Sequence, residues 1–275
     1  MRKIKEILNE TAETEHVTII YACESGSRAW GFESTNSDYD VRFIYVRPLS
    51  SYITIRDRAS CIDKKNGSPD ILKKIFHWDK TYEIDISGWD IIKVMYLIAK
   101  GNPTIAEWLQ SPIVYANTDG PFNQLKKSSE EYYRSKNSIY HYEHMARGNF
   151  NQYIKNIDGV IAKKYLYVLR PIYACEWALR HGTAPPMLFE QLYTDGAILQ
   201  NADFKALLPE LLSLIEKKKS GQELGKGPHI PVIDEICEKL LDGYVDYCRN
   251  LINKDKDYGP LDKLLNEIIR KNQPS

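Results

Sequence analysis

The chain has 275 residues, of which 27% are charged and 43% hydrophobic, a composition typical of globular proteins that form one or two domains. Lys and Arg together number 37, as do Asp and Glu, so the formal net charge is zero. This balance excludes a protein that coats nucleic acid through a basic surface over the whole chain, and it is compatible with a local basic groove.

Cysteine usage and the first residues indicate a reduced, cytoplasmic environment. The five cysteines are odd in number and none forms a Cys-x-x-Cys pair, which argues against a disulfide framework or a structural zinc site. The charged start, MRKIKEILNE, lacks the apolar segment of a signal peptide. Because no run of about 18 apolar residues is present, we expect no membrane span and no membrane partner.

The first 120 residues alternate between strand-like and helix-like patterns. β-branched runs predict strands, and apolar residues at helical spacing predict helices. Ser87, followed by Asp90 three residues later, is typical of a helix N-terminus. The predicted elements are a helix over residues 2–15, strands over 17–23, 39–46 and 81–86, a helix from Ser87 to about residue 100, a short helix over 104–110 and a strand over 113–115.

Helical periodicity dominates the chain from about residue 124. Pro171 lies inside one predicted helix and is expected to kink or split it. The predicted helices cover residues 124–153, 158–180, 187–199, 204–218, 231–253 and 258–271. We therefore predict an α+β fold with a small mixed sheet in residues 1–123 and a helical bundle in residues 124–275, with the active site in the cleft between them.

The most informative stretch is residues 26–41, GSRAWGFESTNSDYDV. Strand alternation would place Asp38 and Asp40 on one face, where two close carboxylates repel each other unless a cation lies between them. A divalent metal with oxygen ligands is the usual cation. Gly26 and Ser27 upstream can bring bare backbone N–H groups and a hydroxyl close to a phosphate. Together these features predict phosphoryl or nucleotidyl transfer.

This spacing resembles the nucleotidyltransferase superfamily that includes DNA polymerase beta. Several blocks are closer still to the predicted nucleotidyltransferases associated with RNA-repair ligases, the RlaP-type family: ESGSRAWGFESTNSDYDVRFIY, DISGWDIIK, GNPTIAEWLQSPIVY and YLYVLRP. The resemblance covers residues 17–190. It implies an N-terminal polymerase beta-like catalytic domain followed by a helical domain, and transfer of a nucleoside monophosphate from an NTP to an acceptor hydroxyl.

The resemblance also implies roles for the acidic residues. Asp38, Asp40 and a third carboxylate would hold two Mg²⁺ or Mn²⁺ ions, and the third carboxylate could accept the proton of the acceptor. Asp85 is the expected third carboxylate, because it matches the family wording, and Glu83 is the alternative of equal strand parity. Gly26 and Ser27 would contact the β and γ phosphates, although a tight turn with a capping serine is compatible with the same residues.

Several basic residues have two open interpretations. Arg28 either binds phosphate or pairs with an acid, and Arg42 either neutralises the carboxylates or forms a plain salt bridge. Glu24 is expected to pair with one of these two arginines, because a carboxylate beside a phosphate site is repelled. Trp30, two residues after Arg28, is expected to pack in a core rather than line a nucleotide pocket.

One face of a predicted helix in the second half carries Lys163, Tyr167 and Arg170 at positions i, i+4 and i+7. In related nucleotidyltransferases, cations on such helices often bind the triphosphate, where they neutralise charge on the leaving pyrophosphate. A solvated helix face is the alternative interpretation. On the first interpretation, all three are candidate nucleotide ligands.

The leading functional prediction is a metal-dependent transferase that uses an NTP donor and an RNA 3′ end, in a pathway that includes an RNA ligase. The same site chemistry would also serve nucleotidylation of a protein or small molecule, since the acceptor is chosen elsewhere. A non-catalytic nucleotide- or RNA-binding regulator is the third hypothesis, which the three intact aspartates disfavour.

Overall fold

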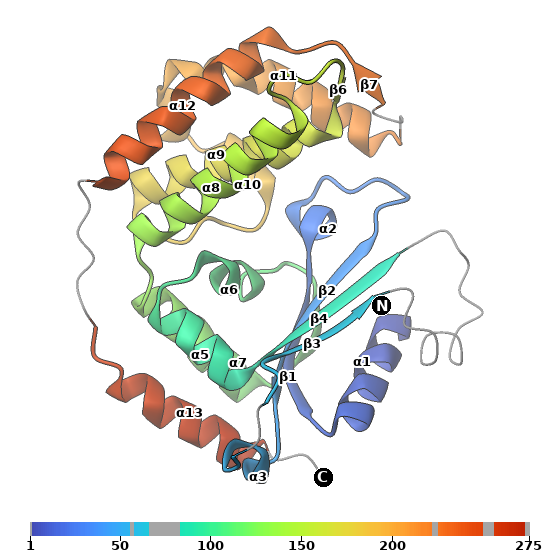
Figure 1. Ribbon diagram of the computed structural model, residues 1–275, viewed down its shortest axis with the longest axis vertical. Helices are drawn as coiled ribbons and strands as arrows, with labels where there is room; N and C mark the ends of the chain where they lie inside the picture. Colours follow the sequence, from blue (N-terminus) through green and yellow to red (C-terminus); the bar gives the residue numbers. More distant parts are fainter. Residues whose placement is uncertain (1, 56–57, 66–82, 222–224, 250–255, 273–275) are drawn as a thin grey trace. The chain divides into compact units, whose positions relative to one another are not determined.

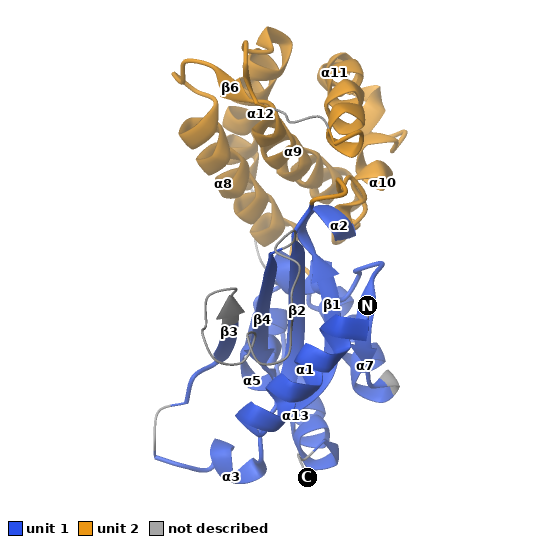
Figure 2. Ribbon diagram, turned by 90° about the vertical axis from the view of Figure 1, so that its right-hand side faces the viewer, with its two compact units in different colours: residues 1–29, 37–132, 255–275 blue, residues 30–36, 133–254 orange. Residues whose placement is uncertain are grey.

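The computed structural model describes residues 2–55, 58–65, 83–221, 225–249 and 256–272. The chain divides into two compact units, coloured separately in Figure 2: unit 1 comprises residues 1–29, 37–132 and 255–275, and unit 2 comprises residues 30–36 and 133–254. The predicted division at residue 123 falls inside helix α7 (Asp119–Glu131). The last helix, α13 (Gly259–Lys271), belongs to unit 1 rather than to the helical half.

Unit 1 is built on a five-stranded mixed sheet with strand order β3-β4-β2-β1-β5. β2 pairs with β4 in parallel and with β1 in antiparallel orientation, and the outer pairs are antiparallel. The small mixed sheet and the α+β class are therefore confirmed. The strands are β1 (Thr18–Ser25), β2 (Tyr39–Val46), β3 (Cys61–Lys65), β4 (Ile84–Asp90) and β5 (Val114–Asn117).

Helices cover both faces of this sheet (Figure 1). The amphipathic helix α1 (Arg2–Glu15) packs its Ile4, Ile7 and Leu8 against one face, next to Phe43 of β2. The opposite face is covered by apolar side chains of α5 (Ile91–Ala99), α6 (Pro103–Trp108), α7 and α13. Two short helices, α2 (Gly26–Trp30) and α3 (Leu49–Tyr52), follow β1 and β2.

The predicted helix start at Ser87 is wrong, because β4 continues to Asp90. Ser87 lies in the strand and donates a hydrogen bond to Asp63 of β3 at 2.5 Å. Asp90 is the N-cap instead, and its carboxylate accepts from the backbone N–H of Ile92 at 2.9 Å. Pairing of β4 with strands on both sides outweighs the local capping preference of Ser87. Residues 81 and 82 of the predicted strand lie outside the described residues.

We expect Asp90→Ala to lower the free energy of unfolding by about 3 kcal/mol, because it removes a helix cap and a buried charge partner. Asp90 is fully buried, and its carboxylate lies 3.7 Å from both Arg47 and Arg58. Ser87→Ala is the matched control and should cost less than about 1 kcal/mol. Urea denaturation followed by circular dichroism measures both variants. Equal losses of stability would contradict the assignment of the N-cap to Asp90 rather than Ser87.

Unit 2 consists mainly of helices that enclose an apolar core rich in aromatic side chains. α8 and α9 pack along each other, and the prediction of a helical second half is confirmed. A two-stranded ribbon joins β6 to β7. The elements are α8 (Ser135–Tyr153), β6 (Val160–Ile161), α9 (Lys163–His181), α10 (Phe189–Tyr193), a 3₁₀ turn η1 (Ile198–Gln200), α11 (Ala202–Lys219), β7 (Lys226–Gly227) and α12 (Pro231–Arg249).

Three predicted helices differ from the structure at their ends or interiors. The helix over 124–153 is two helices, separated where Tyr132 packs into the core of unit 1 while the next helix contributes to that of unit 2. The helix over 158–180 begins only at Lys163, since residues 160–161 form β6. The helix over 187–199 is divided into α10 and η1. Residues 250–253 of the predicted helix 231–253 lie outside the described residues.

Pro171 does not split α9, which runs through it from Lys163 to His181. Proline has no N–H to offer the carbonyl four residues earlier, which belongs to Tyr167. The side-chain amide of Asn149 on α8 donates to this Tyr167 carbonyl at 3.4 Å. The neighbouring helix therefore supplies the hydrogen bond that the proline removes, a compensation that the local sequence of α9 does not reveal.

The cysteines and the apolar content of the helices complete the description of the fold. All five cysteines are free, and four of them are buried. Among the described helices, none combines the length and apolar composition that crossing a membrane requires.

Candidate active site

Two of the predicted aspartates lie side by side at one end of the sheet of unit 1. Asp40 on β2 and Asp85 on β4 are direct partners in the parallel pairing of these strands. The guanidinium of Arg42 lies between them, with Nη2 3.1 Å from Asp85 Oδ2 and 3.4 Å from Asp40 Oδ1. Burial raises the pKa of Asp40, Arg42 opposes this rise, and the carboxylates of Asp85 and Asp38 add to it. The site therefore concentrates negative charge around one internal cation.

Asp38 lies immediately before β2 and is exposed. Its Oδ1 accepts a hydrogen bond from the backbone N–H of Glu83 at 3.2 Å, and the N–H of Tyr39 donates to the Glu83 carbonyl at 2.9 Å. Glu83 thus tethers this segment through its main chain while its side chain is exposed. Of the two predicted third carboxylates, Asp85 is the one that lies beside Asp40.

The three aspartates offer oxygen ligands of the kind that Mg²⁺ and Mn²⁺ accept. As the side chains stand, no three His, Cys, Asp or Glu residues of the described chain form a cluster that could hold a metal. Arg42 lies between Asp40 and Asp85, and Asp38 accepts a hydrogen bond from the main chain of Glu83. The convergence of two carboxylates on one cation shows that this position suits positive charge, so the donor set fits a divalent metal.

Gly26 allows the backbone to approach the carboxylate of Asp40. Its φ is +64°, and a Cβ placed there would lie only 2.1 Å from Asp40 Oδ2. Any L-residue would be both strained and in collision with the candidate metal ligand. The sequence predicts a phosphate contact for Gly26 but not this steric role, for which the spacing to the aspartates is the available signal.

Arg28 contacts the chain just before the aspartates. Its Nη2 and Nε donate to the carbonyl of Ser37 at 2.6 and 3.2 Å, and Nε also donates to the Asp38 carbonyl at 3.1 Å. The guanidinium lies over the ring of Tyr39, 3.9 Å from its centroid. Arg28 therefore holds the backbone that leads into Asp38 and Asp40. Its predicted phosphate contact stays a prediction.

Glu24 supports Asp40 from β1 without pairing with either arginine. It is fully buried and accepts hydrogen bonds from the backbone N–H of Asp40, at 2.7 Å, and from the hydroxyl of Tyr115. The expected ion pair with Arg28 or Arg42 is wrong: within the described residues, Glu24 forms neither. Burial raises the pKa of Glu24 to about 7, although both hydrogen bonds oppose the rise.

The raised pKa makes Glu24 a source of pH-dependent stability. Its folded-state pKa of about 7 exceeds the ordinary glutamate value of 4.5, so the unfolded state loses its proton first and the free energy of unfolding falls as pH rises between these values. We expect the free energy of unfolding of wild type to fall by about 3 kcal/mol more over this pH range than that of Glu24→Gln, because glutamine keeps the size of the side chain and does not ionise. Urea denaturation of metal-free protein from pH 4.5 to 8 measures it. Parallel curves for wild type and variant would contradict the prediction.

The predicted nucleotide ligands of α9 belong to unit 2. Arg170 is buried, with its guanidinium 4.5 Å from the ring centroid of Trp30 and Nη2 donating to the carbonyl of Met187 at 3.2 Å. Tyr167 meets the edge of the same Trp30 ring, at 6.2 Å between centroids. Lys163 is exposed one turn earlier. Trp30 is therefore a packing partner of this helix, as expected, and the triphosphate role of all three stays a prediction.

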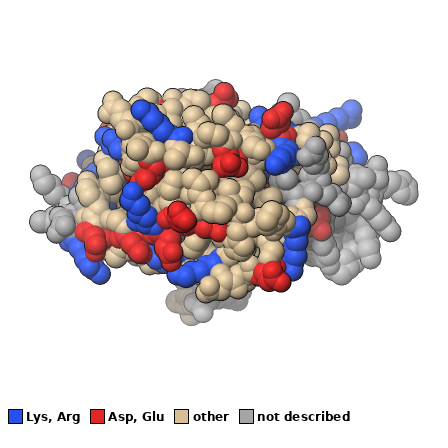
Figure 3. Space-filling model, turned by 90° about the horizontal axis from the view of Figure 1, so that it is seen from above, with Lys and Arg blue, Asp and Glu red and all other residues tan. Residues whose placement is uncertain are grey.

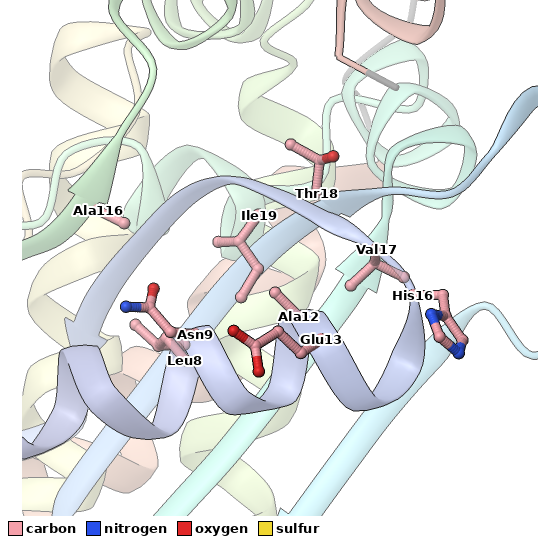
Figure 4. A pocket seen from close by; sticks show the side chains of 9 residues that line it. All are labelled: Leu8, Asn9, Ala12, Glu13, His16, Val17, Thr18, Ile19 and Ala116. Atoms are coloured by element: carbon pink, nitrogen blue, oxygen red, sulfur yellow. The ribbon is translucent and has the colours of Figure 1, made fainter. Parts of the chain in front are cut away.

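A pocket of about 340 Å³ lies elsewhere in unit 1, between α1 and the first residues of β1 (Figure 4). Its polar side chains include Glu13 and His16, and none of the candidate site residues lines it. β1 begins at this pocket and ends at Ser25, next to Gly26. The pocket is thus separated from the aspartates by the length of a strand.

Comparison with known proteins places the chain in a family. The model of the RNA repair pathway DNA polymerase beta family, RlaP, matches residues 1–267. The chain belongs to this family. The RlaP match confirms the resemblance inferred from the Gly-Ser and Asp-x-Asp blocks, and it extends past residue 190, where that resemblance ends.

Two similar proteins accompany the RlaP match. The uncharacterized protein YcgL of Bacillus subtilis (strain 168) is 38% identical over 256 residues, covering 93% of this chain and 91% of YcgL. A crystal structure of a nucleotidyltransferase-like protein from Exiguobacterium sibiricum 255-15 is similar over 98% of this chain and 79% of its own, with 15% identity and a TM-score of 0.35. Membership of RlaP associates the chain with the nucleotidyltransferases of RNA repair.

Proposed function

We propose that the protein transfers a nucleoside monophosphate from an NTP to a hydroxyl group, and that the acceptor is an RNA 3′ end. The observation that carries this proposal is the pair Asp40–Asp85, held on adjacent parallel strands with one cation between them and with Gly26 against it. Paired carboxylates beside a Gly-Ser turn are suited to phosphoryl chemistry, and the family description supports nucleotidyl transfer in RNA repair.

Asp38, Asp40 and Asp85 would hold two Mg²⁺ or Mn²⁺ ions. Such ions, when bound, supply Lewis-acid stabilisation of charge on the phosphate oxygens and lower the pKa of an attacking hydroxyl. The protein's own part is to hold the carboxylates in position: Glu24 anchors the backbone of Asp40, and Arg28 anchors the backbone of Asp38. Asp85 is the group proposed to accept the proton of the acceptor hydroxyl.

Gly26 and Ser27 are proposed to contact the β and γ phosphates of the donor. Lys163, Tyr167 and Arg170 are proposed as further donor ligands from the second unit. Of the two cations, Lys163 is exposed and Arg170 is buried. Neutralising the leaving pyrophosphate is the contribution such cations make in transfer reactions.

The acceptor proposal rests on the family description and on charge. Lys and Arg are equal in number to Asp and Glu, and on the face shown in Figure 3 the two signs are interspersed. Binding a long duplex requires many neutralised phosphates, whereas a short RNA end requires few. The charge distribution therefore favours a terminal hydroxyl over an extended nucleic-acid track.

The test is incubation of wild type and an Asp38→Ala/Asp40→Ala variant with Mg²⁺ or Mn²⁺, each of the four labelled NTPs and an RNA with a 3′ hydroxyl, followed by a sizing gel. Label on RNA with wild type alone supports the proposal and identifies the base. Label on a protein or small molecule instead would favour the alternative acceptors. Metal-dependent NTP binding with no transfer would favour a regulatory binding protein.

A further inference from the structure

Arg42 is more tightly held than a surface ion pair requires. Besides its contacts to Asp40 and Asp85, its Nη1 donates to the main-chain carbonyls of Val41 at 3.0 Å and of Asp85 at 3.1 Å. The guanidinium thus has four acceptors on two neighbouring strands, and only 17% of the side chain is exposed. Arginine suits this position because its planar group can bond several oxygens at once.

The contacts of Arg42 use the same carboxylate oxygens that a divalent metal would use. Asp40 Oδ1 and Asp85 Oδ2 both face the guanidinium. If Asp40 and Asp85 together held a Mg²⁺ ion, their oxygens would lie about 2.0–2.1 Å from it, and a guanidinium could not lie between them at the same time. Arg42 and a bridging metal therefore exclude each other at this position.

We propose that Arg42 is a built-in counter-cation of the Asp40–Asp85 pair, which a divalent metal must displace before it can bridge the two carboxylates. The inference rests on the proposed function, because it takes these aspartates as metal ligands. In the metal-free protein Arg42 offsets the repulsion between two half-buried carboxylates. Its presence also weakens binding of the bridging metal, since the metal has to replace existing charge-assisted hydrogen bonds.

The direct test is Mn²⁺ binding, measured by electron paramagnetic resonance in the presence of α,β-methylene-ATP. For Arg42→Gln we expect binding of the bridging Mn²⁺ to be at least about tenfold tighter than in wild type, because the competing charge is gone. Arg42→Lys, which keeps a cation, should stay within about threefold of wild type. Asp85→Asn should remove the bridging Mn²⁺ in every background. Unchanged or weaker Mn²⁺ binding in Arg42→Gln would overturn the inference.

A second measurement detects the displacement in wild type, independently of variant folding. In ¹⁵N-arginine-labelled protein, the Nη signals of Arg42, assigned by their loss in Arg42→Lys, should sharpen or shift when Mg²⁺ and α,β-methylene-ATP saturate the site. Signals that stay unchanged at saturation would overturn displacement.

Failure of the proposed function gives a different result. If Asp40→Asn binds Mn²⁺ as wild type does, the aspartates are not metal ligands, and both the proposed function and this inference fail. If Asp40→Asn loses Mn²⁺ while Arg42→Gln gains no affinity, the metal site stands and only the role of Arg42 is wrong.

Discussion

Asp40→Asn is expected to reduce nucleotidyl transfer at least about a thousandfold, which corresponds to about 4 kcal/mol of transition-state stabilisation. Asparagine keeps the size of the side chain and removes the charge that a metal ligand needs. The fold should survive, because Arg42 keeps its contact with Asp85 and the backbone N–H of residue 40 still donates to Glu24. The loss would therefore reflect chemistry and not unfolding.

Steady-state transfer to a 3′-hydroxyl RNA, with circular dichroism as a check on folding, measures this effect. Asp63→Asn is the matched control: Asp63 is exposed on β3, which pairs with β4 and not with the strand of Asp40, and it accepts a hydrogen bond from Ser87. We expect the control to retain activity within about threefold of wild type. An Asp40→Asn variant that keeps more than a tenth of wild-type activity would show that Asp40 is not a metal ligand in the reaction.

Gly26→Ala is expected to reduce transfer at least about a hundredfold and to lower the free energy of unfolding by about 2 kcal/mol or more. The added methyl would lie only 2.1 Å from Asp40 Oδ2, and the backbone at φ +64° is unfavourable for alanine. Either the carboxylate or the Gly-Ser turn has to move. In both cases the candidate phosphate site and the candidate metal site lose their relative positions.

Gly182→Ala separates the two causes. Gly182 has nearly the same φ, +66°, at the end of α9, and the nearest atom to an added Cβ is Ser135 Oγ at 3.9 Å. We expect a stability loss of about 1 kcal/mol from backbone strain and unchanged transfer activity. Activity losses of similar size in both variants would attribute the effect of Gly26→Ala to strain and not to contact with Asp40.

Local sequence predicted the parts of unit 1 that depend on nearest neighbours. The apolar stripe of residues 2–15 corresponds to α1, and the β-branched runs correspond to β1 and β2. Both patterns depend only on the spacing of apolar side chains along the local sequence. The Gly-Ser and Asp-x-Asp blocks also sufficed for the family, since their spacing is specific.

Contacts between secondary-structure elements override several predictions made from local sequence. Serine is a common N-cap residue, yet pairing with strands on both sides extends β4 through Ser87 to Asp90. The helical periodicity of the sequence does not indicate the break between α7 and α8. The break arises because the residues before it pack in one apolar core and those after it pack in another. The carbonyl freed by Pro171 is satisfied by Asn149 from another helix.

The candidate site shows the same division. The sequence by itself determined which carboxylates are available and that Asp40 and Arg42 share a strand face, because alternation is a property of one strand. Only the tertiary structure decided that Asp85 lies beside Asp40, that Arg42 contacts both carboxylates, and that Glu24 and Arg28 bond to the backbone of Asp40 and Asp38. Register between strands is set by packing over the entire sheet, so it cannot be predicted from neighbouring residues in the sequence.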